Sequence, residues 1–430
     1  MNKLKYFIKD IKSFLILWST QSLSSLGSSM TSFALIIWSY EKQGSALTPA
    51  LLSVCSYLPY VLMSIFAGAI SDRWNKKITM LVSDSFAAFS TVITLLLIYA
   101  GKLEIWHLYC INALNGLMNT IQQPASDVSI SLLVPKEHYQ KISGMRSFSN
   151  SLLTILTPII ATAILAFGGI QVIIFFDLIT FVIAFISLLC FVRIPNTQKE
   201  NSRKETILKS AGLGLNYLKN NRGILDLILF LAAINFTASV YNAALPAMIL
   251  SREGGGSVEL GIVNSVTGVA LLAGSIITTL LPTPKSRVKI ICNTLLISMS
   301  TENFFLAFGR SVPIWCIGAV LGWIFIPIMN ANMDVLFRNY IPVSMQGRVF
   351  SARNTLQFFT IPIGYFLGGI MIDKVFEPFM ASQETESFLV LIFGNGKGSG
   401  AALLFLILAI VGILTCLIFR MDPHIWELEK

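Results

Sequence analysis

Long apolar runs, each interrupted by a short polar turn, constrain the fold of this sequence more than any other feature. A transmembrane helix takes about 20 apolar residues, and runs of that length recur along the whole chain. Because 54% of the 430 residues are hydrophobic and only 12% are charged, the chain could not cover a soluble core of its size with polar surface. The sequence therefore predicts an all-α membrane protein with twelve transmembrane helices. The predicted spans are 13–38, 46–70, 78–100, 105–131, 145–166, 170–192, 224–250, 259–281, 289–308, 312–336, 349–372 and 399–419.

The positive charges lie mainly in alternate loops between the predicted spans. With the amino terminus inside the cell, 25 of the 31 Lys and Arg residues fall in or beside inner segments, and 6 fall in outer loops. Cytoplasmic loops of membrane proteins carry this excess, so we expect a multi-pass protein of the plasma or inner membrane with both termini in the cytoplasm. The net charge of +9 then reflects orientation and contact with anionic lipids, and no nucleic-acid partner is predicted.

Short segments of the first half recur in the second half in the same order. The segment DVSISLLVP (127–135) matches DVLFRNYIP (334–342) at Asp, Val and Pro, and NSLLTILTP (150–158) matches NTLQFFTIP (354–362). The shifts are 207 and 204 residues, so one duplication explains both matches. We therefore expect two pseudo-symmetric six-helix bundles related by an axis along the membrane normal.

The most polar stretch of the chain separates the two predicted bundles. We expect an N-terminal bundle at 1–194, a cytoplasmic linker at 195–223 and a C-terminal bundle at 224–430. The linker holds seven basic residues and could form an amphipathic helix on the inner membrane surface, with an unstructured tether as the alternative. The apolar face of such a helix would comprise Ile207, Leu208, Ala211, Leu215 and Leu218.

A charged turn, GAISDRWNKK at 68–77, follows the second predicted span. Together with the twelve spans, the two similar halves and the basic middle loop, it resembles the major facilitator superfamily. That family's signature is Gly, three residues, Asp, Arg, one residue, Gly and two basic residues, and this chain has Asn75 in place of the second Gly. Because Asn also tolerates left-handed backbone angles, we expect the tight turn to survive. The matching positions are Gly68, Asp72, Arg73, Lys76 and Lys77.

Three further segments are similar to the macrolide-efflux branch of the drug exporters in that family. They are GSALTPALLSVCSYLPYVLMSIFAGAISDRWNKK, SLLVPKEH and QGRVFSARNTLQFFTIPIGYFLGGIMID. The resemblance implies the major facilitator fold, transport by alternating access, a monomer, and a central cavity lined by the first, fourth, seventh and tenth spans. The exporters' fifth-span signature carries Gly-Pro, whereas Thr157 precedes Pro158 here, which leaves the direction of transport open.

The signature predicts an ionic latch on the cytoplasmic side of the protein. Gly68 would let two helices approach closely, and Asp72 is expected to face the positive amino-terminal end of the eleventh span. The basic residues that follow are expected to pair with an acid at the inner end of the fourth span, or alternatively to serve orientation alone. In the second half, the matching acid is expected to pair with Lys285 or Arg287. The predicted latch comprises Gly68, Asp72, Arg73, Lys76, Lys77, Asp127 and Asp334.

Acidic residues inside the predicted spans are costly to bury and are usually paired or functional. Asp127 and Asp334 lie near inner ends and fit the latch, for which Asp84 is a further candidate. Asp177 and Glu302 lie deeper, with no Lys or Arg assigned nearby. Burial without a cationic partner favours the protonated carboxyl group, so we consider both as proton-coupling candidates. The alternative is a protonated structural residue that is hydrogen-bonded to a neighbouring helix.

Polar residues recur along one face of the fourth predicted span. Asn112, Asn115, Asn119, Gln122 and Ser126 follow one another at spacings of 3, 4, 3 and 4, which places them on one helical face. Amides that face lipid would be costly, so we expect the stripe to face a substrate cavity, with plain helix packing as the alternative. The other candidate cavity residues are Gln21, Asn235, Tyr241 and Asn330, with walls from Trp18, Phe236, Trp323 and Met329.

The sequence lacks the patterns of ATP-driven and enzymatic proteins. It has no G-x-x-x-x-G-K-[ST] loop, and its histidines and cysteines show no catalytic or metal-ligand spacing, so no enzyme, cofactor or metal is predicted. A proton that enters down about 100 mV releases about 2.3 kcal/mol. We therefore expect proton-coupled antiport of a small amphiphilic drug of the macrolide type, with protons and membrane lipids as partners. The alternatives are export of an endogenous amphiphile such as a siderophore, and a non-transporting receptor or scaffold.

Overall fold

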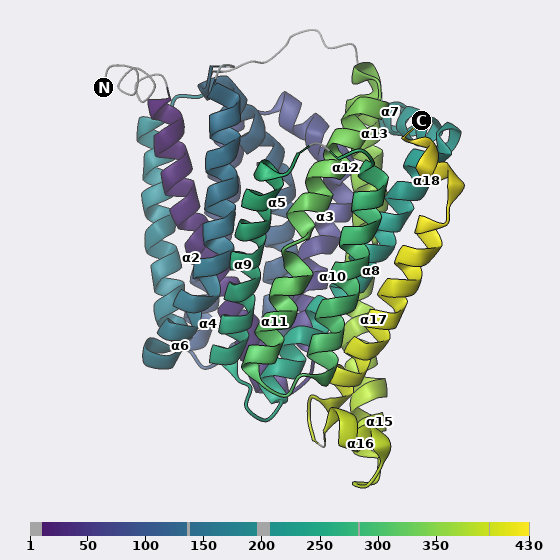
Figure 1. The fold of residues 1–430 in the computed structure, drawn as a ribbon. Helices are drawn as coiled ribbons and strands as arrows, with labels where there is room; N and C mark the ends of the chain where they lie inside the picture. The colour runs from purple at the N-terminus through teal and green to yellow at the C-terminus, as the bar shows by residue number, and fades with distance from the viewer. Residues whose placement is uncertain (1–10, 136–137, 196–206, 283, 395, 430) are drawn as a thin grey trace. The chain divides into compact units, whose positions relative to one another are not determined.

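Each of the twelve predicted spans coincides with helix in the structure (Figure 1). This computed structural model describes residues 11–135, 138–195, 207–282, 284–394 and 396–429. No strand occurs in these ranges, and the predicted all-α membrane fold is confirmed. The side chains that are not described within these ranges are those of residues 64–73, 131, 139–141, 143–144, 207–211, 343–344, 346–347 and 351.

Five helical runs cover the six spans predicted for the first half. The last run contains the spans predicted at 145–166 and 170–192, and Gly169 interrupts it between them with φ 70° and ψ 179°. Glycine adopts such positive φ angles without a steric penalty, so the run is two helices joined by a tight turn. The runs are α2 (Lys12–Gln43), α3 (Leu47–Arg73), α4 (Lys76–Tyr99), α5 (Ile105–Leu133) and α6 (Tyr139–Phe191).

Some spans of the second half that were predicted as single helices are divided into shorter helices in the structure. The span predicted at 312–336 is split in two, and Pro327 stands at the start of the second part, where proline is favoured because its missing N–H would be unpaired anyway. The span predicted at 349–372 is divided between two helices and ends within a short π-helix, η2. The elements are α7 (Ile207–Asn220), α8 (Arg222–Ser251), α9 (Ser257–Leu280), α10 (Arg287–Phe308), α11 (Val312–Trp323), α12 (Ile326–Tyr340), α13 (Val343–Phe358), α14 (Thr360–Ile370), η2 (Met371–Phe376), α15 (Glu377–Ala381), α16 (Phe388–Phe393), α17 (Ser399–Arg420) and α18 (Pro423–Glu427).

Eight helical stretches among the described residues are long and apolar enough to cross a membrane. The helices α2 and α5 are not among them, although their lengths of 32 and 29 residues would suffice. Both helices carry many Ser, Thr, Asn and Gln residues, and such side chains are tolerated in a span only where they face protein or water. Their composition therefore marks α2 and α5 as the helices that border a polar interior.

The chain divides into two compact units. Unit 1 comprises Met1–Ile36 and Cys55–Glu205, and unit 2 comprises Ile37–Val54 and Thr206–Lys430. This division differs from the predicted one because the turn between α2 and α3 packs within unit 2. There, Asp373 of η2 accepts hydrogen bonds from the Ser45 hydroxyl at 2.5 Å and from two backbone N–H groups at the start of α3, both at 2.9 Å.

The predicted linker contains a helix, as expected, and this helix belongs to unit 2. Within α7, Leu218 is buried and joins the core of unit 2, whereas Leu215, on the predicted apolar face, is 48% exposed. That core consists of apolar side chains from α8, α10 and α12, together with Val349, Cys416 and Ile425. Burial of Leu218 in this core ties the end of the linker helix to the unit that follows it.

Candidate functional site

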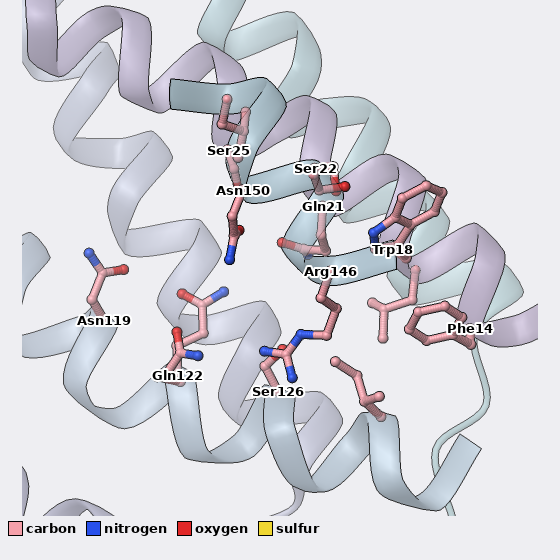
Figure 2. Close-up of a pocket in the computed structure, with 15 residues that line it drawn as sticks. Phe14, Trp18, Gln21, Ser22, Ser25, Asn119, Gln122, Ser126, Arg146 and Asn150 are labelled. Atoms are coloured by element: carbon pink, nitrogen blue, oxygen red, sulfur yellow. The ribbon is translucent and has the colours of Figure 1, made fainter. Parts of the chain in front are cut away.

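A cavity of about 240 Å³ lies in unit 1 and is lined by side chains from α2, α5 and α6 (Figure 2). Its walls combine amide and hydroxyl groups with one guanidinium group and the rings of Phe14 and Trp18. Sites for whole drug-sized ligands occupy about 300–1,000 Å³, so this cavity fits one end of such a ligand. The polar lining comes mainly from Gln21, Ser22, Asn119, Gln122, Ser126 and Asn150.

The polar stripe predicted on the fourth span contributes directly to this cavity, but not over its whole length. Asn112 donates to the backbone carbonyl of Leu108 on its own helix at 2.9 Å. The side-chain oxygen of Asn115 is buried and has no hydrogen-bond partner among the described residues. The predicted cavity residues that line the cavity are Gln21, Asn119, Gln122 and Ser126.

Asp84 of α4 is hydrogen-bonded to two of these lining amides. Its Oδ2 accepts from Gln21 Nε2 at 3.0 Å, and its Oδ1 accepts from Gln122 Nε2 at 2.5 Å. Each carboxylate oxygen thus has one amide donor, one from α2 and one from α5. Asp84 was a candidate for the latch, but these contacts place it beside the cavity. This pairing was not predictable from the sequence, because Gln21 is 63 residues from Asp84.

Trp18 supplies both an apolar wall and an unpaired donor to the cavity. Its ring stacks on Phe14 with 6.4 Å between centroids, as expected for an apolar wall. Its indole Nε1 is buried and has no hydrogen-bond partner among the described residues. A buried donor without a partner costs about 1–3 kcal/mol, so an acceptor group on a ligand in the cavity would relieve that cost.

Arg146 of α6, which the sequence analysis did not single out, also lines the cavity. Its guanidinium donates to Asp127 Oδ1 at 2.7 Å. In unit 2, Arg353 lies 3.8 Å from Asp334. The repeat shift of 207 residues relates Asp127 to Asp334 and also Arg146 to Arg353, so the internal repeat contained a signal that could have identified both arginines.

Part of the predicted latch lies outside the described side chains, namely Gly68, Asp72 and Arg73, and their contacts stay predictions. Asn75 does not form the left-handed turn expected from the family signature, because its φ of −65° and ψ of 118° are extended. It serves instead as the N-cap of α4, and its side chain accepts from the Ile78 N–H at 3.2 Å. N-cap residues need this extended backbone. Lys76 follows the cap and donates to the Trp74 carbonyl at 3.1 Å.

Lys77 was predicted to pair with Asp127, but the structure shows other partners for it. Its ammonium group donates to the backbone carbonyls of Leu189 at 2.9 Å and Val192 at 2.8 Å, at the carboxyl end of α6. The last carbonyls of a helix have no partner within the helix and carry a partial negative charge. Lys77 therefore stabilises the end of a neighbouring helix within unit 1.

The pairing predicted for Asp334 is also wrong. Its cationic neighbour is Arg353 and neither Lys285 nor Arg287. Arg287 donates to Asn332 Oδ1 at 3.1 Å. Asp334 is 57% exposed, so its pair with Arg353 is solvent-screened and weak.

Asp177 of α6 is buried in unit 1, with 4% of its surface exposed. Its Oδ1 accepts from the Ser28 hydroxyl at 2.9 Å, and its Oδ2 accepts from the Thr31 hydroxyl at 3.0 Å. Both donors lie on α2. Hydroxyl groups can donate or accept by rotation, so this site can accommodate either protonation state of the carboxyl group.

Glu302 of α10 is buried in unit 2, with 3% of its surface exposed. Its Oε1 accepts from the Tyr241 hydroxyl at 2.5 Å and from Trp323 Nε1 at 2.7 Å. Tyr241, predicted to line the substrate cavity, is instead buried and packs edge-on against Phe405. A buried carboxyl group requires donors, and these rings supply them. The contacts cross-link α8, α10 and α11 and match the structural alternative for Glu302.

The remaining two predicted cavity residues also lie outside the cavity of unit 1. Asn235 donates to the Gln357 carbonyl at 3.1 Å and so joins α8 to α13. Asn330 is exposed on α12. Both are in unit 2, and the described cavity is formed by unit 1 alone.

A family model for the Major Facilitator Superfamily matches residues 17–364 of the chain. The chain belongs to the major facilitator superfamily. This confirms the predicted family and identifies the protein as a multi-pass membrane transporter and not an enzyme. Repeated halves, as the internal sequence matches predict, are typical of this superfamily.

Named relatives in the superfamily include efflux proteins. Macrolide efflux protein A of Streptococcus pyogenes is 25% identical over 367 residues, which cover 84% of this chain and 90% of that protein. Macrolide efflux protein A of Enterococcus faecalis is 25% identical over 326 residues, covering 75% of this chain and 99% of that protein. An uncharacterized MFS-type transporter of Bacillus subtilis, YfiS, is 23% identical over 382 residues, covering 86% and 89%.

Solved structures of other superfamily transporters share the fold. The nucleoside transporter NupG superposes with a TM-score of 0.70 at 14% identity, over 94% of this chain and 98% of that chain. A bacterial homologue of the human lysosomal transporter Spinster gives 0.65 at 15% identity, over 96% and 99%. At these identities the likeness establishes the fold alone.

Proposed function

We propose that the protein is a secondary active exporter of small amphiphilic molecules of the macrolide type, driven by proton antiport. The observation that carries the proposal is the likeness to Macrolide efflux protein A, which extends over 84% of this chain and 90% of that relative. The cavity in unit 1 supports it, because aromatic rings and neutral amides suit an amphiphilic ligand. The protein would act as a monomer in the cell membrane, with both termini in the cytoplasm.

Proton coupling needs a carboxyl group that exchanges a proton during transport. Of the two predicted candidates, Asp177 has the more suitable surroundings, because its hydroxyl partners can reverse their hydrogen bonds. Glu302 accepts from an indole N–H, which can only donate. Of the predicted latch, Gly68, Asp72 and Arg73 remain part of this proposal, since they would close and open the cytoplasmic side as the two bundles alternate access.

The test is transport of a labelled macrolide by the full chain. Everted membrane vesicles from cells that express the protein should accumulate radiolabelled erythromycin when a respiratory substrate energises them, and an uncoupler should abolish the accumulation. Vesicles without the protein are the control. No accumulation would contradict the substrate class, and accumulation that survives the uncoupler but requires ATP would contradict proton antiport.

A further inference from the structure

Asp84 has no cationic partner among the described residues, and its hydrogen bonds there are with neutral groups. Its two carboxylate oxygens are hydrogen-bonded to the amides of Gln21 and Gln122, and no ion pair with Asp84 occurs among the described residues. The helix of Asp84, α4, packs on α5 and α6. The charged or titratable side chains described on these helices and on the unit 1 part of α2 are Lys12, Lys76, Lys77, Tyr99, His107, Tyr109, Cys110, Asp127, Arg146, Asp177 and Cys190.

The protonation state of Asp84 determines which way the two amides face. An ionised carboxylate can only accept hydrogen bonds, so both glutamines must turn an N–H toward it, as they do at 3.0 Å and 2.5 Å. Each amide then keeps its carbonyl oxygen for another partner. Because both glutamines also line the cavity, these oxygens are the acceptors that a ligand there can use.

A proton on Asp84 changes this arrangement. The protonated carboxyl group has one O–H donor, which needs an acceptor. Rotation of one glutamine amide about its last torsion, which is broad and roughly two-fold, brings that amide's oxygen to the new O–H. The same rotation turns its NH₂ group away from Asp84. The proton comes from solution, and no covalent bond of the ligand changes. The cavity therefore loses one hydrogen-bond acceptor and gains one hydrogen-bond donor.

We propose that Asp84 is a proton-operated specificity switch for the cavity in unit 1, which when ionised selects the hydroxyl-bearing end of an amphiphilic ligand. A ligand hydroxyl group can donate to a glutamine oxygen and accept from the indole N–H of Trp18, which has no partner among the described residues. When that amide rotates, the hydroxyl group loses the acceptor for its own O–H. Arg146 in the same wall disfavours a cationic end. Proton binding to Asp84 weakens ligand binding. The inference rests on the proposed function, to which it adds a second carboxyl group, in addition to Asp177, that exchanges a proton during transport.

Binding measurements on the purified full chain in detergent test the switch, with radiolabelled erythromycin as the probe. Wild-type affinity is expected to fall on acidification, by up to about tenfold per pH unit for one competing proton. Asp84→Asn, which cannot ionise, should bind the probe with an affinity that is flat across the same pH series. Asp422→Asn, a matched change of a residue that caps α18 in unit 2, should retain the wild-type pH dependence. A pH dependence that persists in Asp84→Asn would overturn the proposal.

A second variant covers the outcome in which Asp84→Asn fails to fold. The double variant Gln21→Leu, Gln122→Leu keeps Asp84 but removes both amides that would reverse, so it should bind more weakly and without pH dependence. Retained pH dependence in this variant would also overturn the switch.

Infrared difference spectroscopy of the ligand-free protein separates the switch from the proposed function. Acidification should produce the carbonyl stretch of a protonated carboxyl group, together with a shift of the glutamine side-chain amide bands, in wild type and in Asp422→Asn. The carboxyl signal assigned to Asp84 should be absent in Asp84→Asn. If the wild type never binds erythromycin but shows these signals, the proposed function fails and the switch is supported; their absence overturns the switch.

Discussion

Asp84 in unit 1 and Glu302 in unit 2 are both carboxyl groups held by neutral donors from two other helices, yet their surroundings differ. The partners of Asp84 are two glutamine amides beside a cavity. The partners of Glu302 are the hydroxyl of Tyr241 and the indole N–H of Trp323. Both partners of Asp84 can exchange donor for acceptor by rotation, whereas at Glu302 only the Tyr241 hydroxyl can do so, because the indole N–H of Trp323 only donates. The hydrogen-bond partners therefore decide whether a buried acid responds to a proton or serves as a fixed cross-link.

The same contrast separates the two tryptophans at these sites. Trp323 donates its N–H to Glu302 and so completes the hydrogen bonding of a packed interior. The N–H of Trp18 is buried beside the cavity without a partner among the described residues. Polar groups in the Glu302 site are thus satisfied by the protein, while at the cavity an unsatisfied group remains for a ligand.

The largest expected effect comes from removing the acid of the fixed site. Glu302→Leu leaves two buried donors, those of Tyr241 and Trp323, without an acceptor, so the free energy of unfolding should fall by about 2–6 kcal/mol. Thermal unfolding of the purified protein in detergent, followed by circular dichroism, measures the loss. Glu302→Gln is the control, because its amide oxygen can accept from both donors and the loss should be much smaller. Equal losses in the two variants would contradict the cross-link.

Asp177 is an intermediate case, and one of its donors can be removed without a change of shape. Thr31→Val takes away the hydroxyl that donates to Asp177 Oδ2 and should lower stability by about 1–3 kcal/mol, the cost of one unsatisfied buried group. The same unfolding assay measures it, with Thr278→Val as a control. The hydroxyl of Thr278 donates to the Gly274 carbonyl of its own helix. A neutral effect of Thr31→Val would show that Asp177 does not depend on this donor.

The two tryptophans give a smaller and more selective effect. Trp18→Phe removes the unpaired N–H, so stability should not fall, whereas binding of labelled erythromycin should weaken by about 0.5–1.5 kcal/mol, the net value of one hydrogen bond. Trp323→Phe should do the reverse and lower the unfolding temperature. The comparison would break if both variants lost stability to the same extent.

The smallest effect is expected at the exposed ion pair of unit 2. Asp334→Asn should change stability by about 0.2–1 kcal/mol, because Asp334 is 57% exposed and its distance to Arg353 is 3.8 Å. Arg353→Ala should cost more than Asp334→Asn, since the guanidinium also lies 4.7 Å from the centre of the Phe337 ring and donates to Gln357. Double-mutant analysis of unfolding temperatures measures both. A larger effect of Asp334→Asn would indicate that the pair has a role beyond local packing.

Much of the cavity was predictable from sequence because helical spacing is a local property. The 3, 4, 3, 4 spacing on the fourth span identified the face that carries Asn119 and Gln122, and both line the cavity. The partners of those residues were not predictable. Lys77 was assigned to Asp127 by charge alone, but it reaches the end of α6. Charge complementarity leaves many pairings open, and helix packing selects among them.

The sequence by itself determined the membrane class, the twelve spans, the internal repeat and the family. Each of these follows from apolar length, spacing along one helix or order along the chain, which need no knowledge of neighbours. Only the tertiary structure decided that Asp84 meets Gln21 and Gln122, that Tyr241 donates to Glu302, and that the Trp18 N–H has no partner in the described part of the chain. A buried polar group takes its partner from whichever helix packs against it, and that choice depends on all the helices of its unit together.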